Sequence, residues 1–567
     1  MRIIWAITLL LVNCLFVVSA TTINAILESP SAIPQKPILM SELFIPDRAQ
    51  KKSQKGHIAL QMDKLRAKIQ VIQSASPLQE NIEILPDMSF NWVSNELGEV
   101  IPEKRHLLHS DNPNWDFFIG VGEFWGTPPE HQGSKISLPF AIVEKNENCV
   151  HNGVLVIELG LAGSSNQFYY QISSETCAYF KADFWGTGTA HYTENTSDSP
   201  SEIVTQYEAE KHARLPWVAL DELAKKLPKI KIENLALPQR IALTDMSAYG
   251  VLYKDVHYVS SCPTRAGNYP FCEQLVLPSY STAKSLFAGL AMFYLEKHYG
   301  DVFEQPVNRW IEQCSDSQWQ GVTFGHLLDM TTGNFDSAQY GVDEASADKL
   351  SFFTAKTNEG RIAYACNHYV RKRPPASTFV YHSSDTYLLG AGLNKFIKSK
   401  LGENADIFND ILYKQIFLPL GLSQISAKTR RTLDEAQQPY TGYGLFFNRH
   451  DLVKLSLYIQ RQSTSTESAS ELSKNYLLAG LQQAPNNRGA TTDYPNIRYQ
   501  HGFWGRKVDA KFKCKSESWI PFMSGYGGIT LAFLGNNNTY YYVSDSYQFN
   551  WTEALSELDK LNSVCSG

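Results

Sequence analysis

The order of strand-like and helix-like segments after about residue 215 constrains the fold of this chain more than any other feature. Strand patterns occur over residues 250–260 and 273–277 and return at 497–508, 529–534 and 539–543. Alternating helices and loops are expected between these two groups, up to about residue 480. Because strands need partners, we expect both ends of this region to build one antiparallel sheet, with a helical domain inserted between them, in an α+β fold.

A second strand-rich region comes earlier in the chain. Turn residues separate five strand patterns between residues 115 and 195, whereas residues 21–105 look loosely organised apart from an amphipathic helix expected over 51–74. We therefore expect a β-rich N-terminal domain over residues 21–215 and a second domain over 216–567. The five expected strands are 115–119, 136–143, 153–159, 167–172 and 178–184.

The first twenty residues have the pattern of a signal peptide. Met1-Arg2 is followed by an apolar run over 3–18, and Val18-Ser19-Ala20 fits the small-residue rule for cleavage before Thr21. A lipoprotein signal at Cys14 and an uncleaved anchor are the alternatives, although the run is short for a spanning helix. No later segment is long and apolar enough to span a membrane. We expect a secreted or periplasmic protein.

Eight cysteines remain after the signal peptide, and an even number in an exported chain predicts disulfides. Eight cysteines allow 105 pairings. The nearest-neighbour pairing closes modest loops and keeps each bridge within one domain. A metal site is the rival, but no C-x-x-C or H-x-x-x-H spacing supports it, so we expect no metal. The expected pairs are Cys149–Cys177, Cys262–Cys272, Cys314–Cys366 and Cys514–Cys565.

The charge balance narrows the expected partners. The formal net charge is -6 and the sequence has no long basic run. These properties give no support for nucleic-acid binding or for a polybasic membrane anchor. The 43% hydrophobic and 12% aromatic content is typical of a globular protein with substantial cores.

Ser281 and Lys284 form an S-x-x-K pair at the start of an apolar helical run over residues 281–298. Residues three apart share a helix face, so Lys284 is expected within reach of the Ser281 oxygen, which needs a nearby base to act as a nucleophile. The motif alone is weak, because an N-cap serine is an equally ordinary reading. A second copy, Ser346 to Lys349, is interpreted as chance.

Three stretches resemble the serine β-lactamase and penicillin-recognising superfamily. They are PSYSTAKS at 278–285, VTFGHLLDMTTG at 322–333 and FVYHSSDTYLLG at 379–390. The nearest branch in wording is the class C-type serine hydrolases, which include esterases, D-aminopeptidases and nylon-oligomer hydrolases. The resemblance covers about residues 240–560 and implies the β-lactamase-like, transpeptidase-like fold. It implies that Ser281 is the nucleophile and that Lys284 is its partner.

The second motif of that superfamily, Y-x-N or Y-x-S, is matched by Tyr381-His382-Ser383. The resemblance implies that Tyr381 serves with Lys284 in accepting the serine proton. A phenol titrates near pH 10 and a neighbouring ammonium favours its phenolate, so we expect a lowered pKa at Tyr381. Ser383 is expected to contact substrate or Lys284. His382 and His326 are interpreted as structural or rim residues.

The third motif, K-T-G or H-x-G in relatives, is assigned to Tyr526-Gly527-Gly528, with His501-Gly502 as a rival. The resemblance implies an oxyanion hole from the backbone N–H groups of Ser281 and Ile529. Tyr526 replaces the lysine that holds the antibiotic carboxylate in β-lactamases, which favours an esterase or amidase. Arg506 or Lys507 is a candidate for a replacement charge.

We therefore expect an exported serine hydrolase that acts through an acyl-enzyme on a small-molecule or short-peptide ester or amide, without a cofactor. One alternative is a β-lactamase or D-Ala peptidase-type penicillin-binding enzyme. Another is a catalytically inactive binding or envelope module.

Overall fold

The computed structural model describes residues 23–28, 33–44, 54–75, 81–125, 134–160, 165–194 and 199–565. The expected signal peptide lies outside these residues. The chain folds into two compact units. The first comprises the described residues up to Glu144, Cys149–His212 and Ser261–Val276. The second comprises Lys145–Asn148, Ala213–Ser260 and the described residues from Leu277 onward.

Unit 1 is built on a nine-stranded antiparallel sheet in the order β4-β6-β5-β3-β2-β1-β9-β8-β7. A further pairing between β6 and β7 closes the sheet, so that every strand except β4 belongs to a closed ring. The strands are β1 (Lys55–Ser74), β2 (Met88–Ser94), β3 (Glu99–Pro102), β4 (Trp115–Ile119), β5 (Gly122–Trp125), β6 (Ser134–Glu144), β7 (Val150–Leu159), β8 (Ser165–Thr176) and β9 (Phe180–Thr193).

The five strands expected between residues 115 and 195 are confirmed as β4 and β6 to β9. The helix expected over residues 51–74 is wrong, because β1 occupies this stretch. Its apolar residues Ile58, Leu60 and Met62 recur every second position and are all buried, which is the period of a strand. The loosely organised region is therefore part of the sheet.

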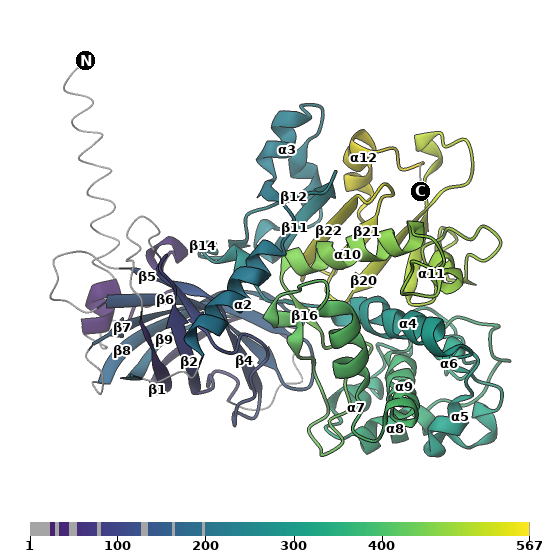
Figure 1. Cartoon of the computed structure of the whole chain (residues 1–567), viewed down its shortest axis with the longest axis horizontal. Helices are drawn as coiled ribbons and strands as arrows, with labels where there is room; N and C mark the ends of the chain where they lie inside the picture. Colours follow the sequence, from purple (N-terminus) through teal and green to yellow (C-terminus); the bar gives the residue numbers. More distant parts are fainter. Residues whose placement is uncertain are drawn as a thin grey trace. The chain divides into compact units, whose positions relative to one another are not determined.

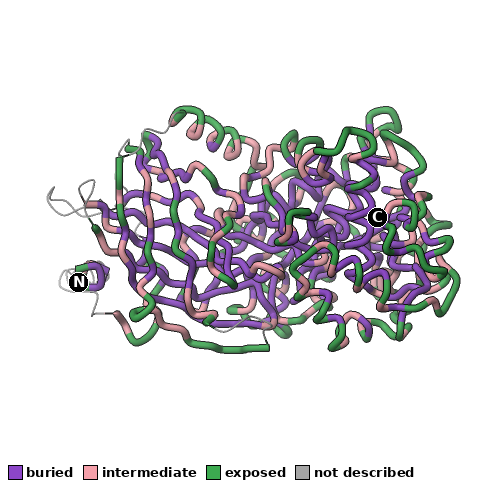
Figure 2. The backbone as a smooth tube through the Cα atoms, turned by 90° about the horizontal axis from the view of Figure 1, so that it is seen from below, coloured by how far each residue is buried: buried purple, intermediate pink, exposed green. Residues whose placement is uncertain are grey.

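One face of the unit 1 strands forms an apolar core that includes Trp92, Trp115, Phe140 and Phe168. Buried residues concentrate along the strand backbones, and exposed ones concentrate at turns and outer helices (Figure 2). Helix α2 (Pro200–His212) packs Tyr207 against a separate small cluster of Val93, Ile101 and Val121.

Unit 2 has the sheet that the sequence predicts from both ends of this region. Its order is β10-β12-β11-β22-β21-β20-β19-β18-β17, so early and late strands meet where β11 pairs with β22. The expected strand over 273–277 is wrong for most of its length, since a 3-10 turn occupies Cys272–Gln274. The strands are β10 (Trp217–Ala219), β11 (Met246–Tyr253), β12 (Val256–Val259), β17 (Ala490–Thr491), β18 (Ile497–Gln500), β19 (Phe503–Lys507), β20 (Trp519–Gly525), β21 (Ile529–Phe533) and β22 (Thr539–Ser544).

The helices of unit 2 form a group beside this sheet, with α9 in contact with α5, α6 and α8 (Figure 1). Two short strands, β15 (Leu277–Pro278) and β16 (Phe446–Phe447), pair separately. The helices are α3 (Asp221–Lys226), α4 (Leu290–Tyr299), α5 (Val307–Trp310), α6 (Phe324–Leu328), α7 (Lys349–Thr354), α8 (Asn358–Asn367), α9 (Ser383–Leu401), α10 (Arg449–Thr464), α11 (Lys474–Gly480) and α12 (Thr552–Leu561), with π-helical segments η8 (Lys284–Gly289) and η11 (Ile407–Phe417).

All four predicted disulfides are present, with Cα–Cα distances between 4.9 and 5.6 Å. In the part of the chain that the structure describes, no helix combines the length and the apolar character needed to cross a membrane.

Candidate active site

Ser281 lies in a single 3-10 turn, η7 (Tyr280–Thr282), which leads directly into the π-helical turn η8. Lys284 is the first residue of η8, and its Nζ lies 3.1 Å from Ser281 Oγ. The structure therefore brings the S-x-x-K pair into direct hydrogen-bond contact. A π-helical segment is a frequent local feature of functional sites.

Lys284 is almost completely buried, with 2% of its surface exposed. Its Nζ donates to Ser383 Oγ at 2.9 Å and to the Gly442 carbonyl at 3.3 Å. Burial lowers the pKa of Lys284 to about 8, although the Glu344 carboxylate acts in the opposite direction. The lysine can therefore exchange a proton near neutral pH.

Tyr381 stands over the same ammonium, with Lys284 Nζ 4.9 Å from the centre of its ring. The lowered pKa that the sequence predicts for Tyr381 is wrong. Burial raises the pKa of Tyr381 well above its ordinary range, and the charge of Glu344 adds to this, although a hydrogen bond with Ser281 opposes it. Tyr381 is thus a neutral phenol beside the serine hydroxyl, and Lys284 is the better proton acceptor.

Charged side chains of one segment, residues 343–349, form hydrogen bonds with the second motif and the residue after it. His382 Nε2 lies 3.0 Å from Asp343 Oδ2, and the Ser383 backbone N–H donates to Glu344 Oε2 at 3.0 Å. Lys349 Nζ donates to Ser384, the residue after the motif, at 2.9 Å. Three consecutive residues, His382 to Ser384, therefore each bind a charged side chain from this segment.

Lys349 corrects the interpretation of the second S-x-x-K copy. Its side chain is buried and lies 3.2 Å from Glu344, whereas the Ser346 hydroxyl accepts the Lys349 backbone N–H and donates to the Asp343 carbonyl. Burial opposes ionisation of Glu344, but Lys349 and Lys284 together hold the pKa of Glu344 below its ordinary range. The lysine of this copy therefore belongs to the charge network of the site.

The third-motif residues form the tight turn between β20 and β21. Gly527 and Gly528 have φ of 86° and 104°, a conformation that favours glycine. The Tyr526 ring lies 5.7 Å from the Tyr280 ring, and its hydroxyl lies 2.6 Å from that of Tyr547. This turn is therefore adjacent to η7, which is named the nucleophile turn because it carries Ser281, the proposed nucleophile.

The sequence reasoning missed Gly525 at the end of β20. A Cβ at this position would lie 2.9 Å from the Ser279 carbonyl oxygen and 3.3 Å from Tyr280 Cβ, so only glycine allows this approach. A Cβ at Gly528 would instead meet Gln548 and Ser544. The Gly525-Tyr526 end of the turn is thus the part against the nucleophile turn, and the strand that carries Met523 to Gly525 borders the site.

The rival third-motif residues, His501 and Gly502, contact neighbouring elements of the site. The Gly502 carbonyl accepts Ser285 Oγ at 2.6 Å, and the His501 backbone N–H donates to Asp329. The candidate replacement charges have other partners. Arg506 donates to Thr552 at 2.7 Å, and Lys507 pairs with Glu517.

The two family-segment histidines have structural contacts. His326 Nδ1 accepts the Thr323 backbone N–H and completes a capping box on α6. For His382, burial opposes protonation, but hydrogen bonds to Asp343 and Asp385 raise its pKa above the ordinary value.

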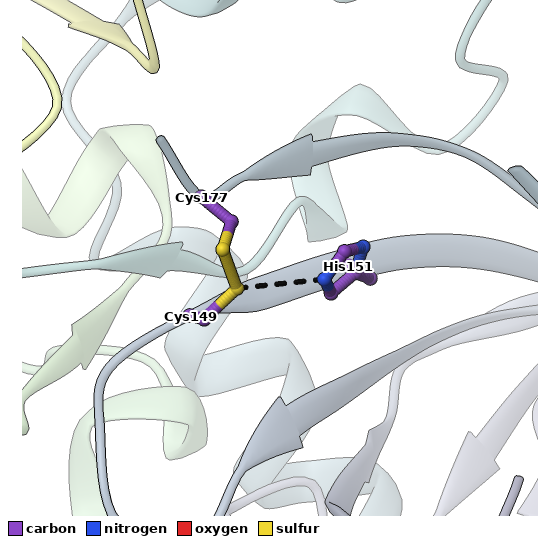
Figure 3. Close-up of side chains that lie close together, drawn as sticks. All are labelled: Cys149, His151 and Cys177. Carbon is purple, nitrogen blue, oxygen red and sulfur yellow. Dashed lines mark hydrogen bonds between the residues drawn. A yellow bond between two sulfur atoms is a disulfide. The ribbon is translucent and has the colours of Figure 1, made fainter. Parts of the chain in front are cut away.

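Cys149, His151 and Cys177 of unit 1 form a cluster of metal-ligating types, with their ligand atoms within 4.8 Å of one another. Figure 3 shows the two sulfurs bonded to each other and a hydrogen bond between Cys149 and His151. The distance from His151 Nε2 to Cys149 Sγ is 3.4 Å. A disulfide offers no thiolate for a metal. This donor set does not fit a metal ion while the bridge is intact.

The solved structures to which the chain is similar include the following three. A putative 6-aminohexanoate-dimer hydrolase from Bacillus anthracis has 15% identity and a TM-score of 0.41, covering 56% of this chain and 78% of that one. A class C beta-lactamase has 15% identity and a TM-score of 0.41, covering 61% and 97%. A penicillin-binding protein homologue from Caulobacter crescentus has 14% identity and a TM-score of 0.38, covering 56% and 91%.

No curated protein matches the sequence. The family model described as Beta-lactamase matches residues 251–545, which is more than half of the chain and includes every residue of the three motifs. The chain therefore belongs to the beta-lactamase family.

Proposed function

We propose that this protein is a serine hydrolase that cleaves an ester or amide through an acyl-enzyme on Ser281. The observation that carries this proposal is the contact of 3.1 Å between Ser281 Oγ and the buried Lys284 Nζ. Burial lowers the pKa of Lys284 to about 8, which gives the serine a base that is partly neutral at physiological pH.

In the acylation step, neutral Lys284 accepts the Ser281 proton while Ser281 Oγ forms a bond to the substrate carbonyl carbon. The phenol of Tyr381, which hydrogen-bonds Ser281, donates a proton to the leaving group as its bond to carbon breaks. The ammonium of Lys284 then returns a proton to Tyr381. In deacylation, neutral Lys284 accepts a proton from water as the water oxygen forms a bond to the acyl carbon. Its ammonium then gives a proton to Ser281 Oγ as the bond between that oxygen and the acyl carbon breaks, which releases the acid and restores the enzyme.

The oxyanion requires two backbone N–H donors aimed at one point. We assign the first to Ser281 and the second to Tyr526 or Ile529, which flank the glycines between β20 and β21. The contacts of Gly525 and Tyr526 with the nucleophile turn favour the Tyr526 N–H, whereas Ile529 is paired with Gly525 in the sheet ladder.

The proposed substrate class follows from the charge of the third motif. Tyr526 offers a ring and a hydroxyl, with 43% of its surface exposed, where β-lactamases place a lysine for the antibiotic carboxylate. Arg506 and Lys507 are engaged by Thr552 and Glu517. These features favour a neutral ester or amide over a β-lactam.

The test is labelling of the mature protein with a fluorophosphonate probe. Wild type should be labelled, and Ser281→Ala should not. Ser346→Ala is the matched control, because it removes the serine of the other S-x-x-K copy and should leave labelling intact. Equal labelling of wild type and Ser281→Ala would overturn the assignment.

A panel of substrates then separates the alternatives. Turnover of a p-nitrophenyl ester without turnover of nitrocefin supports the proposal, whereas nitrocefin turnover assigns β-lactam chemistry. Absence of both labelling and turnover would leave an inactive binding module.

We also propose that the protein is exported. The four disulfides support this, since they persist in oxidising compartments. N-terminal sequencing of the mature protein should begin at Thr21, and a start at Met1 would contradict the proposal.

A further inference from the structure

Asn148 lies between β6 and β7 in the sequence but belongs to unit 2, and its side chain is directed at the nucleophile turn. Its Oδ1 accepts the backbone N–H of Tyr280 at 2.7 Å, the hydroxyl of Ser279 at 3.2 Å and the backbone N–H of Gly444 at 3.2 Å. We propose that Asn148 is a positioning residue that holds the backbone on which Ser281 and Lys284 react.

The first contact supports a strained residue. Tyr280 directly precedes Ser281 and has φ of 40°, in the left-handed region that a bulky residue rarely adopts. Such a conformation persists only where its surroundings hold it. The Asn148 oxygen binds the N–H of this same residue and so fixes the peptide that orients Ser281.

The third contact fixes the other side of the pair. Gly444 lies two residues after Gly442, whose carbonyl accepts Lys284 Nζ at 3.3 Å. Ser279 also joins the segment before Ser281 to the segment that contains Gly444. Its backbone N–H donates to the Leu445 carbonyl at 2.9 Å, and its hydroxyl accepts the Leu445 N–H at 3.1 Å. The Asn148 side-chain oxygen therefore links the backbone before Ser281 to the Gly442–Gly444 segment, which binds Lys284 Nζ.

Asn148 is buried, and this bonding is one-sided. Among the described residues, its Nδ2 has no hydrogen-bond partner, so its structural contribution comes from the oxygen alone. The residue also lies outside the stretch that the family model matches. The segment Lys145–Asn148, which lies among the strands of unit 1 in the sequence, therefore supplies unit 2 with a residue that holds the backbone around Ser281.

This inference rests on the proposed function, and the experiment separates the two. The second-order rate of fluorophosphonate labelling and the kcat and KM for a p-nitrophenyl ester are measured for wild type, Asn148→Ala, Asn148→Asp and Asn394→Ala. The last is the control, a buried asparagine on α9 whose oxygen accepts the Ile407 backbone N–H at 2.9 Å. Thermal melts and near-UV circular dichroism report whether each variant is folded.

Asn148→Ala should lower the labelling rate and kcat by about 10- to 100-fold with KM changed by less than about threefold, because the loss is one of alignment. Asn148→Asp keeps the acceptor oxygen and should recover most of the rate. Asn394→Ala should lose thermal stability but keep the labelling rate.

Three results would overturn the inference. The first is wild-type labelling and kcat in folded Asn148→Ala, and the second is an Asn148→Asp variant that is folded but as slow as Asn148→Ala. The third is an equal loss of rate in Asn394→Ala. If wild type itself is not labelled, the proposed function fails and this inference fails with it.

Discussion

The carboxylate of Glu344 lies 3.2 Å from the Nζ of Lys349 and accepts the backbone N–H of Ser383 at 3.0 Å. Ser383 in turn accepts a hydrogen bond from Lys284 Nζ. Of the two buried lysines, Lys349 contacts the Glu344 carboxylate directly, whereas Lys284 interacts with its charge at longer range. Only Lys284 contacts the proposed nucleophile. Burial is the main cause of the lowered pKa of Lys284, and the charges of Glu344 and Lys349 adjust this pKa in opposite directions.

The first prediction concerns the pH dependence of the wild-type enzyme. Burial lowers the pKa of Lys284 to about 8, and only its neutral form accepts the serine proton. The value of kcat/KM for a neutral ester should therefore rise with pH through about pH 8 and level off about one unit above it. A profile that falls with increasing pH through this range would contradict the role of Lys284 as the base.

The second prediction uses the two charges that act on Lys284 in opposite directions. Glu344→Gln removes the anion that favours the ammonium, so the rising limb should move to lower pH. Lys349→Met removes a cation that disfavours it, so the rising limb should move to higher pH.

The size of each shift should be about one unit or less. Both substitutions break a buried ion pair and should destabilise the fold, so thermal stability does not distinguish them. Opposite movements of the kinetic pKa are therefore the measurement, and shifts of the same sign would contradict the account.

The third prediction separates the two proton carriers. Tyr381→Phe removes the phenol that protonates the leaving group but leaves Lys284 and Ser281 in contact. Hydrolysis of an amide or alkyl ester should fall by about 100- to 10,000-fold, because these leaving groups need a proton. Hydrolysis of a p-nitrophenyl ester, whose leaving group needs none, should fall much less. Equal losses on both substrates would show that Tyr381 does not act on the leaving group.

The fourth prediction concerns the approach of β20 to the nucleophile turn. Gly525→Ala places a Cβ 2.9 Å from the Ser279 carbonyl oxygen, and the two backbones must separate. The labelling rate should fall by at least about tenfold. Gly360→Ala is the control, because its Cβ on α8 has only side-chain atoms of Thr357 and Ala355 within 4 Å, the nearest at 3.1 Å. Equal rates for the two variants would place the oxyanion hole elsewhere.

The parts of the fold that the sequence predicts are those with a local signal. Residues 136–143 and 153–159 are rich in β-branched and aromatic residues, which predicts strands there, and β6 and β7 occupy these positions. The sequence indicates a helix where β1 forms, because Leu65 and Ile69 break the regular alternation of Ile58, Leu60 and Met62. Here pairing with β2 and β9 decides the conformation, and no short-range pattern reveals it.

The same division applies to the site. The spacing of Ser281 and Lys284 predicts their contact because both lie on one helical turn. Asn148, Glu344 and Lys349 reach the site from other segments, so their roles depend on long-range folding. The direction of the Tyr381 pKa was wrong because burial outweighs the field of a nearby ammonium, and burial is a property of the folded chain.

The most direct test of the central claim is mass spectrometry of the protein quenched in acid during hydrolysis of a p-nitrophenyl ester. The account predicts a covalent adduct with the mass of the acyl group, located by peptide mapping on Ser281 and absent from Ser281→Ala. An adduct on another residue, or steady turnover in Ser281→Ala at the wild-type rate, would contradict it.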